Sequence, residues 1–300
     1  MPNITIKDFI QENSNYLRQY QIPNPEHDVA LILSHYLQIE YLELFLQPNR
    51  MIMEDEPLLP IFYQAGKENC LPARLRQAIE ERSTRKPLQY ILGNVHFANC
   101  YLEVNESVLI PRPETEFMVD YIRRNEVSPK YILDLGTGSG AVAIALKKYF
   151  PRSQVYAIDI CQRALQMAKQ NAKLNNCEIK FLRSNLFVKF FSSGLKFDLI
   201  VSNPPYVNIK DYPTLQPEIF FEPKKALVAK DQGLFFLKKI ISSIPTFLSN
   251  HGVLYLEIGS EQKKDLTRFI NQRGWKNFWF IQDLQGLDRI LKISSTLDVE

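Results

Sequence analysis

Four consecutive residues, Asn203-Pro204-Pro205-Tyr206, combine groups that can hold a planar polar ligand. They follow an apolar run at residues 197–202, which is typical of a buried strand. Two prolines cannot donate hydrogen bonds to a sheet, so we expect the strand to end there with a stiff, extended backbone. Ligands of open α/β sheets bind beyond the carboxyl ends of the strands, so the amide side chain, the free carbonyls and the aromatic ring are candidate catalytic groups. The alternative is a rigid turn without further role.

A glycine-rich turn lies upstream of this motif. A short apolar run at residues 131–135 leads into Gly136-Thr137-Gly138-Ser139-Gly140, and a stretch rich in helix formers follows. Glycines let the backbone turn sharply and let a ligand approach the main chain. The spacing differs from the G-x-G-x-x-G of dinucleotide enzymes, and Asp134 would repel a phosphate. Asp134 instead suits a positively charged ligand, such as an amino acid with its ammonium group or a sulfonium.

A second acidic residue, Asp159, ends the apolar run at residues 154–158. Nucleoside-binding sheets place an acid at this point to accept hydrogen bonds from ribose hydroxyls, although a lone aspartate after a strand is more often a helix cap. No G-x-x-x-x-G-K-[ST] sequence supports ATP binding. The glycine turn, the acid and the Asn-Pro-Pro-Tyr motif (residues 203–206) together predict S-adenosylmethionine as the cofactor.

The elements that must position these groups form two predicted domains. Residues 1–85 read as a small helical domain, residues 86–115 as a linker containing a hairpin near 95–104, and residues 116–300 as the catalytic domain. In the catalytic domain, strands near 131, 155, 179, 198, 253, 276 and 289 alternate with helical segments. This order predicts an α/β, doubly wound (Rossmann-like) sheet whose last strands form a hairpin.

Local signals mark the helices of the first domain. Residues 5–8 form a predicted capping box, and Asn24-Pro25 predicts a cap followed by proline at the first helical position. The apolar stripes of these helices are expected to be core. A basic stretch at 73–85 predicts another helix, and its charges are expected to form a solvated face more than a partner-binding surface. The members of that basic run are Arg74, Arg76, Arg82, Arg85 and Lys86.

The chain resembles the bacterial peptide-chain release factor glutamine N5-methyltransferases. The resemblance rests on the sequence DLGTGSG at 134–140, on Asp159 and on the Asn-Pro-Pro-Tyr motif. It extends to LIPRPETE at 109–116, FEP at 221–223, LEIG at 256–259 and DLQGLDR at 283–289, and to PLQYILG at 87–93 as the linker. It is strong from about residue 83 to 292.

The resemblance implies an S-adenosylmethionine-dependent methyltransferase fold with a small N-terminal helical domain that binds release factors. The implied catalytic residues are Asn203, Pro204, Pro205 and Tyr206. The implied cofactor-binding residues are Asp134, Gly136, Thr137, Gly138, Ser139, Gly140, Asp159, Asn185, Leu186 and Asn203.

Three segments need comment against that family. The family usually has an acid and an aromatic residue beside the adenine, where this chain has Asn185 and Leu186. Residues 49–71 look longer than the usual helix connection. Residues 111–116 are either an interdomain turn that starts a helix or a lid over the substrate, in which Arg112 or Glu114 orders the active-site loop.

Composition limits the alternatives. A net charge of +3 does not indicate strong nonspecific nucleic-acid binding. The four cysteines form no close pairs, the four histidines are scattered and no C-x-x-C occurs, which argues for reduced thiols and against a structural zinc site. No run reaches membrane length and no signal pattern opens the chain, so we expect a cytoplasmic protein, without metal and monomeric.

The resemblance implies that the reaction is methylation of the glutamine in the Gly-Gly-Gln segment of release factors. The same four residues at 203–206 also suit an exocyclic adenine amine, so an adenine N6-methyltransferase acting on nucleic acid is the main alternative. The adenine alternative lacks support because no separate, strongly basic domain for recognising nucleic acid is evident. Glutamine methylation of a ribosomal protein is a second alternative, and a non-enzymatic binding protein is a third.

Overall fold

The computed structural model describes residues 4–53 and 70–295. The chain divides into two compact units. Unit 1 comprises Met1–Gly93 together with Pro217–Phe221, and unit 2 comprises Asn94–Gln216 and Glu222–Glu300. The hairpin expected in a linker therefore lies in unit 2, and a short segment from the second half of the chain belongs to unit 1.

Unit 1 is helical, as its apolar periodicity predicts. The Thr5 hydroxyl accepts the Asp8 backbone N–H, which confirms the predicted cap. The second helix begins at Pro25 as predicted, but Asn24 makes no side-chain cap bond. Its ψ of 64° lies outside the extended conformation that places a capping side chain over the first helical N–H groups. The elements are β1 Ile4–Thr5, α1 Ile6–Gln19, α2 Pro25–Leu37, α3 Tyr41–Leu46, β2 Met51–Ile52, α4 Leu71–Ser83, α5 Leu88–Leu92 and the 3-10 helix η4 Pro217–Phe221.

The core of unit 1 lies where α1, α2 and α4 pack together. Phe9, Leu17 and Leu33 are fully buried in it, in agreement with the expected apolar stripes. The two-stranded ladder of β1 and β2 places Ile52 against the same core. The long connection expected at residues 49–71 lies largely outside the described residues, because 54–69 are not described.

The prediction of a solvated basic face on α4 is wrong for two of its arginines. Arg74 and Arg82 are 3% and 5% exposed. Arg82 Nε donates to Asp28 Oδ2 at 2.7 Å, and Arg82 Nη2 donates to Glu218 Oε1 at 3.1 Å. A buried guanidinium needs such acceptors, since burial of an unpaired charge is costly. Alternating charges along a helix do not reveal acceptors that come from distant parts of the chain.

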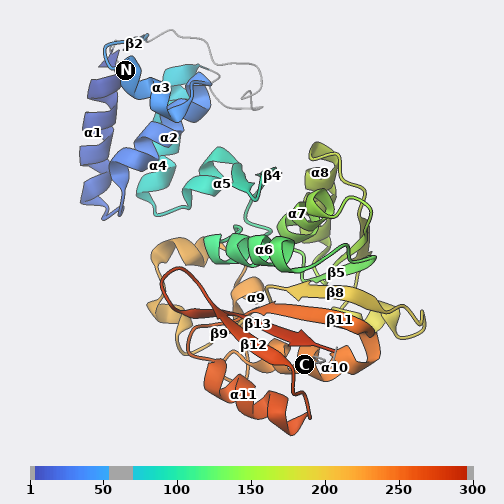
Figure 1. Cartoon of the computed structure of the whole chain (residues 1–300). Helices are drawn as coiled ribbons and strands as arrows, with labels where there is room; N and C mark the ends of the chain where they lie inside the picture. Colours follow the sequence, from blue (N-terminus) through green and yellow to red (C-terminus); the bar gives the residue numbers. More distant parts are fainter. Residues whose placement is uncertain (1–3, 54–69, 296–300) are drawn as a thin grey trace. The chain divides into compact units, whose positions relative to one another are not determined.

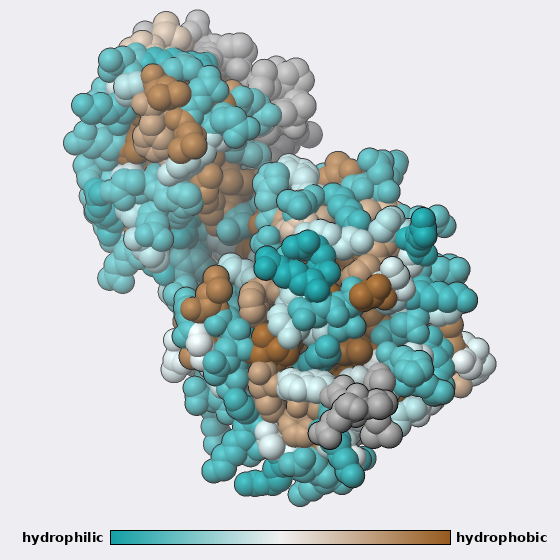
Figure 2. Space-filling model, in the orientation of Figure 1, coloured by the Kyte–Doolittle hydropathy of each residue, from teal (hydrophilic) through white to brown (hydrophobic). Residues whose placement is uncertain are grey.

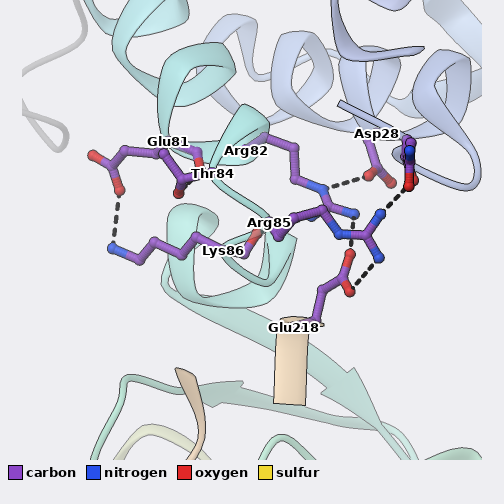
Figure 3. Close-up of polar contacts among 8 residues, drawn as sticks. Asp28, Glu81, Arg82, Thr84, Arg85, Lys86 and Glu218 are labelled. Carbon is purple, nitrogen blue, oxygen red and sulfur yellow. Dashed lines mark hydrogen bonds and ion pairs between the residues drawn. The ribbon is translucent and has the colours of Figure 1, made fainter. Parts of the chain in front are cut away.

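Glu218 connects η4 to Arg82 on α4 and to Arg85, which follows that helix. Its second oxygen accepts Arg85 Nη2 at 2.7 Å, and Arg85 Nη1 also donates to the Gln21 carbonyl. Figure 3 shows the Glu218 carboxylate in contact with both guanidinium groups, and Asp28 in contact with Arg82. We call Asp28, Arg82, Arg85 and Glu218 the arginine clasp. It contains two positive and two negative groups, so its net charge is zero.

Unit 2 is built around a seven-stranded sheet with the order β12-β13-β11-β8-β5-β6-β7. Its central strands run parallel, and β13 is antiparallel to both of its neighbours. The chain moves outward from β5 to β6 and β7, and then returns to β8 on the other side of β5. The doubly wound sheet and its terminal hairpin are confirmed. The strands are β5 Tyr131–Leu135, β6 Gln154–Asp159, β7 Lys180–Arg183, β8 Phe197–Ser202, β11 Leu248–Glu257, β12 Phe278–Gln282 and β13 Asp288–Ser294.

Helices cover both faces of this sheet (Figure 1). Alternating strand residues point to opposite sides, so Ile132 packs with α6, α7 and α8 whereas Leu133 packs with α10 and α11. The helices are α6 Pro113–Asn125, α7 Ala141–Tyr149, α8 Gln162–Leu174, α9 Lys224–Leu227, α10 Phe235–Phe247 and α11 Lys263–Gln272.

Short elements complete unit 2. The antiparallel hairpin of β3 and β4 confirms the strands expected near 95–104, and β9 pairs in parallel with β10. They are β3 Asn94–Phe97, β4 Cys100–Glu103, β9 Val207–Asn208, β10 Val228–Ala229 and the 3-10 helices η2 Leu186–Phe190 and η3 Tyr212–Thr214. Among the described residues, none of the helices combines the length and the apolar character that a membrane span requires.

Candidate active site

Two sequence motifs meet where the strand order of the sheet reverses. Leu135, the last residue of β5, pairs with Ser202, the last residue of β8. The Ser202 hydroxyl also donates to the Leu135 carbonyl at 2.6 Å. The glycine loop (residues 136–140) and the Asn-Pro-Pro-Tyr motif therefore leave the sheet side by side. This crevice at the carboxyl ends is the usual ligand position in open α/β sheets.

The glycine loop has a backbone that only glycine adopts easily. Gly136 and Gly138 have φ values of +74° and +55°, and a Cβ added to either would meet no atom within 4 Å. The loop therefore leaves open space beside its main chain, into which a ligand can fit. A Cβ on Gly140 would instead lie 3.1 Å from the Ala168 Cβ, so this glycine permits α7 and α8 to pack closely.

Side-chain hydrogen bonds hold the glycine loop in place. The Thr137 hydroxyl donates to Asp134 Oδ2 at 2.6 Å. The Ser139 carbonyl accepts the side chain of Asn171 at 2.9 Å, and the same side chain bonds both backbone groups of Glu103. Asn171 is fully buried on α8 and was not identified from the sequence. It ties the loop to the β3–β4 hairpin.

Two carboxylates lie beside the loop, of which Asp134 is buried and Asp159 is half-buried. Asp159 accepts the Gly138 N–H at 3.0 Å on one oxygen and the Cys161 N–H at 2.8 Å on the other. Burial raises the pKa of Asp134 to about 7 against the lowering effect of the Thr137 hydroxyl, and burial also raises the pKa of Asp159. A cationic ligand would favour the charged form of both groups. The two carboxylates therefore fit a cationic nucleoside ligand of the kind that the sequence predicts.

The expected adenine contacts lie at the same edge of the sheet, after β7. Ser184 N donates to the Asp159 carbonyl at 3.0 Å, which keeps this loop beside the acid. Asn185 is exposed, and Leu186 is half-buried with a φ of +47°. A left-handed backbone is unfavourable for leucine, and such strain clusters at ligand sites. The placement is compatible with the predicted contact to adenine, which stays a prediction.

The side-chain nitrogen of Asn203 donates a hydrogen bond within the protein. Asn203 Nδ2 donates to Thr115 Oγ1 at 2.9 Å, and the Thr115 hydroxyl donates to Glu257 Oε2. The Tyr206 hydroxyl donates to the other oxygen of Glu257 at 3.0 Å. Glu257 thus contacts Tyr206 directly and Asn203 through Thr115. Pro204 of the same motif is buried.

Glu257 is 1% exposed, and burial raises its pKa to about 7 while the two hydroxyl donors lower it. Its place follows from the sheet register, in which Leu256 pairs with Ser202, so Glu257 lies beside Asn203. Burial and the neighbouring Glu257 raise the pKa of the Tyr206 phenol. The Tyr206 carbonyl accepts Gln262 Nε2 at 3.1 Å, which fixes the end of the motif.

Residues 111–116 lead into α6, which begins at Pro113, and one of them reaches the site. Thr115 makes the contact described above, whereas Arg112 forms an ion pair with the buried Glu222. Glu222 also accepts the Ile110 N–H at 3.0 Å. Thr115 and Glu257 were not predicted as site residues. An acidic residue inside an otherwise apolar strand, as in residues 253–258, was the available signal for Glu257.

Two family profiles match the chain. The Methyltransferase small domain matches residues 113–262, and the PrmC N-terminal domain matches residues 8–59. Among solved structures, a methyltransferase from Pyrococcus furiosus is 18% identical with a TM-score of 0.52, covering 66% of this chain and 90% of that one. The catalytic domain of hMettl16 is 15% identical with a TM-score of 0.56, covering 91% and 93%. These structures share the methyltransferase fold.

Curated relatives are similar over nearly the whole chain. Release factor glutamine methyltransferase of Fusobacterium nucleatum is 35% identical, covering 98% of this chain and 82% of the relative. The protein of the same name from Geobacter sulfurreducens is 32% identical, covering 96% and 95%. With both profiles, the fold and these relatives in agreement, the chain belongs to the release factor glutamine methyltransferase family.

Proposed function

We propose that this S-adenosylmethionine-dependent enzyme methylates the N5 nitrogen of the glutamine in the Gly-Gly-Gln segment of peptide chain release factors. The observation that carries the proposal is the position of Asn203. It stands at the strand-order reversal next to the glycine loop, with its nitrogen bound to Thr115. Its oxygen is then available as an acceptor for the N–H of a substrate amide.

The residues around the glycine loop would hold S-adenosylmethionine. Asp159 has lone pairs left on both oxygens for ribose hydroxyls, and the open backbone at Gly136 and Gly138 leaves room for the ligand. Asp134 precedes the loop and accepts the hydroxyl of Thr137 within it. Asn185 and Leu186 are placed to meet the adenine. The cofactor supplies an electrophilic methyl group attached to a positively charged sulfur.

The chain's own residues act by orienting the target amide. An amide nitrogen is a weak nucleophile because its lone pair is delocalised into the carbonyl. The Asn203 oxygen and the Pro204 carbonyl each accept one amide hydrogen, which aims the nitrogen at the methyl group. Pro205 stiffens the turn, and Tyr206 packs against the planar amide. Orientation of this kind can supply roughly 7–11 kcal/mol. No base is needed, because the extra proton leaves to water after the N–C bond has formed.

The helical domain predicted at residues 1–85 would bind the release factor. Its helix α3 exposes Leu42, Phe45 and Leu46, whose exposed fractions are 75%, 52% and 81%. Apolar residues also appear among polar ones on the face of the protein in Figure 2. Grouped exposed apolar side chains are typical of protein-binding surfaces. The glycines of the substrate segment would let its backbone enter a narrow crevice.

The state of the cysteines bears on the compartment in which the enzyme would work. The four thiols, Cys70, Cys100, Cys161 and Cys177, are unpaired, as expected in a reducing compartment. We therefore place the enzyme in the cytoplasm, where it meets newly made release factors, and expect it to act as a monomer.

A comparison of acceptors tests the proposal. The full-length enzyme is incubated with labelled S-adenosylmethionine and, in parallel, with a release factor, a ribosomal protein and DNA. We expect label on the release factor alone, and no label when its Gly-Gly-Gln glutamine is replaced. Stronger labelling of DNA would support the adenine alternative, and labelling of the ribosomal protein would support the second alternative.

A further inference from the structure

Asn203 belongs to a chain of hydrogen bonds that ends inside the protein. Its Nδ2 lies 2.9 Å from Thr115 Oγ1, and the Thr115 hydroxyl contacts Glu257 Oε2. Thr115 and Glu257 are 4% and 1% exposed, so water does not compete for these contacts. Tyr206 occupies the second oxygen of Glu257, which leaves the first oxygen to Thr115.

The hydroxyl groups of Thr115 and Tyr206 favour the ionised form of Glu257 against the effect of burial, and in that form the direction of every bond is fixed. An ionised carboxylate only accepts hydrogen bonds, and a threonine hydroxyl has one hydrogen to give. That hydrogen goes to Glu257, so Thr115 can only accept from Asn203. A flipped Asn203 amide would place its oxygen against the lone pairs of Thr115. The two ends of an amide look alike in shape, but this chain of bonds allows only one orientation.

The orientation of Asn203 decides which substrate group it can bind. With Nδ2 turned toward Thr115, Oδ1 faces away from it, and no hydrogen bond among the described residues engages Oδ1. We propose that Thr115 and Glu257 are positioning residues that lock the Asn203 amide with its oxygen toward the acceptor substrate. This fixed orientation of Asn203 by Thr115 and Glu257, which we call the lock, selects a substrate group that donates N–H and rejects a carboxylate. It rests on the proposed function, in which Asn203 binds the target amide.

The lock predicts a specific pattern of kinetic defects. Thr115→Val keeps the shape of the side chain and removes the hydroxyl, whereas Thr115→Ser restores the hydroxyl. For Thr115→Val we expect kcat to fall by about tenfold to a hundredfold, less than the loss that follows removal of a preorganised polar group itself. The KM for the release factor should change by less than about threefold, since the partner surface is untouched. Thr115→Ser should recover most of the activity.

Discrimination between substrates gives a second readout. Wild-type enzyme should bind a Gly-Gly-Gln peptide with much higher affinity than the matching Gly-Gly-Glu peptide, because two acceptor oxygens would face each other in the complex with Gly-Gly-Glu. Thr115→Val frees the amide to flip and present Nδ2, so the preference should shrink. A raised KM with an unchanged kcat and an unchanged preference would assign Thr115 a merely structural role and overturn the proposal.

A spectroscopic test separates the lock from the substrate assignment. Enzyme labelled with 15N-asparagine gives a side-chain signal for Asn203, identified by its loss in Asn203→Asp. We expect that signal to shift in Thr115→Val and to stay near its wild-type position in Thr115→Ser. An unchanged signal in Thr115→Val contradicts the lock even if release factors are methylated. A shifted signal supports the lock even if the acceptor proves to be different. Thr115→Ala provides the same comparison if Thr115→Val does not fold.

Discussion

The arginine clasp predicts how firmly η4 is held to the other elements of unit 1. In Glu218→Gln, the charge that lies between Arg82 and Arg85 is removed, and the net charge of the clasp changes from zero to +1. The side chains of Arg82 and Glu218 are 6% and 17% exposed, so solvent screens this change poorly. Breaking a buried pair costs about 3–5 kcal/mol when one charge loses its only partner.

The cost at this site should be smaller, because both arginines keep another acceptor. Arg82 retains Asp28 and the Lys86 carbonyl, and Arg85 retains the Gln21 carbonyl. We therefore expect a loss of about 1.5–3 kcal/mol, in the range of hydrogen bonds to charged groups. Because 1.4 kcal/mol corresponds to a factor of ten, amide hydrogens of residues 218–221 should exchange at least tenfold faster.

Hydrogen exchange followed by mass spectrometry measures this effect segment by segment. Glu81→Gln is the matched control, because Glu81 pairs with Lys86 at 2.9 Å with side chains 31% and 23% exposed. A pair of this exposure contributes roughly 0–1 kcal/mol, so the control should exchange nearly as wild type. Unchanged exchange of residues 218–221 in Glu218→Gln would refute the role assigned to the clasp.

Two further predictions concern the cofactor. Asp159→Ala should weaken S-adenosylmethionine binding by more than tenfold in calorimetry, since a charged acceptor for hydroxyls contributes about 1.5–3 kcal/mol; an unchanged affinity would contradict the ribose assignment. Burial raises the pKa of Asp134 to about 7, so the free protein holds this proton below that pH and a cationic ligand should expel it. The affinity for S-adenosylmethionine should therefore rise as pH increases toward about 7 and level off above it. Binding below that pH should release a proton, and Asp134→Asn should abolish this release. Proton release that persists in Asp134→Asn would assign the proton to another group, such as Asp159.

The sequence predicts most of the fold because its signals are local. The strand at 131–135, the glycine loop and the strand before Asn203 follow from apolar runs and from residues with restricted backbones. Once a doubly wound order is assumed, the ends of β5 and β8 must be neighbours, so the meeting of the two motifs could also be predicted.

The rest depends on contacts between distant residues. Glu257 reaches Asn203 only because β11 pairs with β8 in one particular register, and periodicity does not determine register between strands far apart in sequence. Thr115 reaches the site through the placement of α6. Arg82 looked like a surface charge because its partners, Asp28 and Glu218, lie 54 and 136 residues away.

Tandem mass spectrometry of a release factor after reaction tests most directly whether Asn203 orients a glutamine amide for methylation. Wild-type enzyme should add one methyl group to the side-chain nitrogen of the Gly-Gly-Gln glutamine. Asn203→Ala should slow that addition by roughly 10²–10³-fold, as removal of one preorganised polar group does elsewhere, while calorimetry shows nearly unchanged S-adenosylmethionine binding. A methyl group on another residue, or a wild-type rate in Asn203→Ala, would contradict this mechanism.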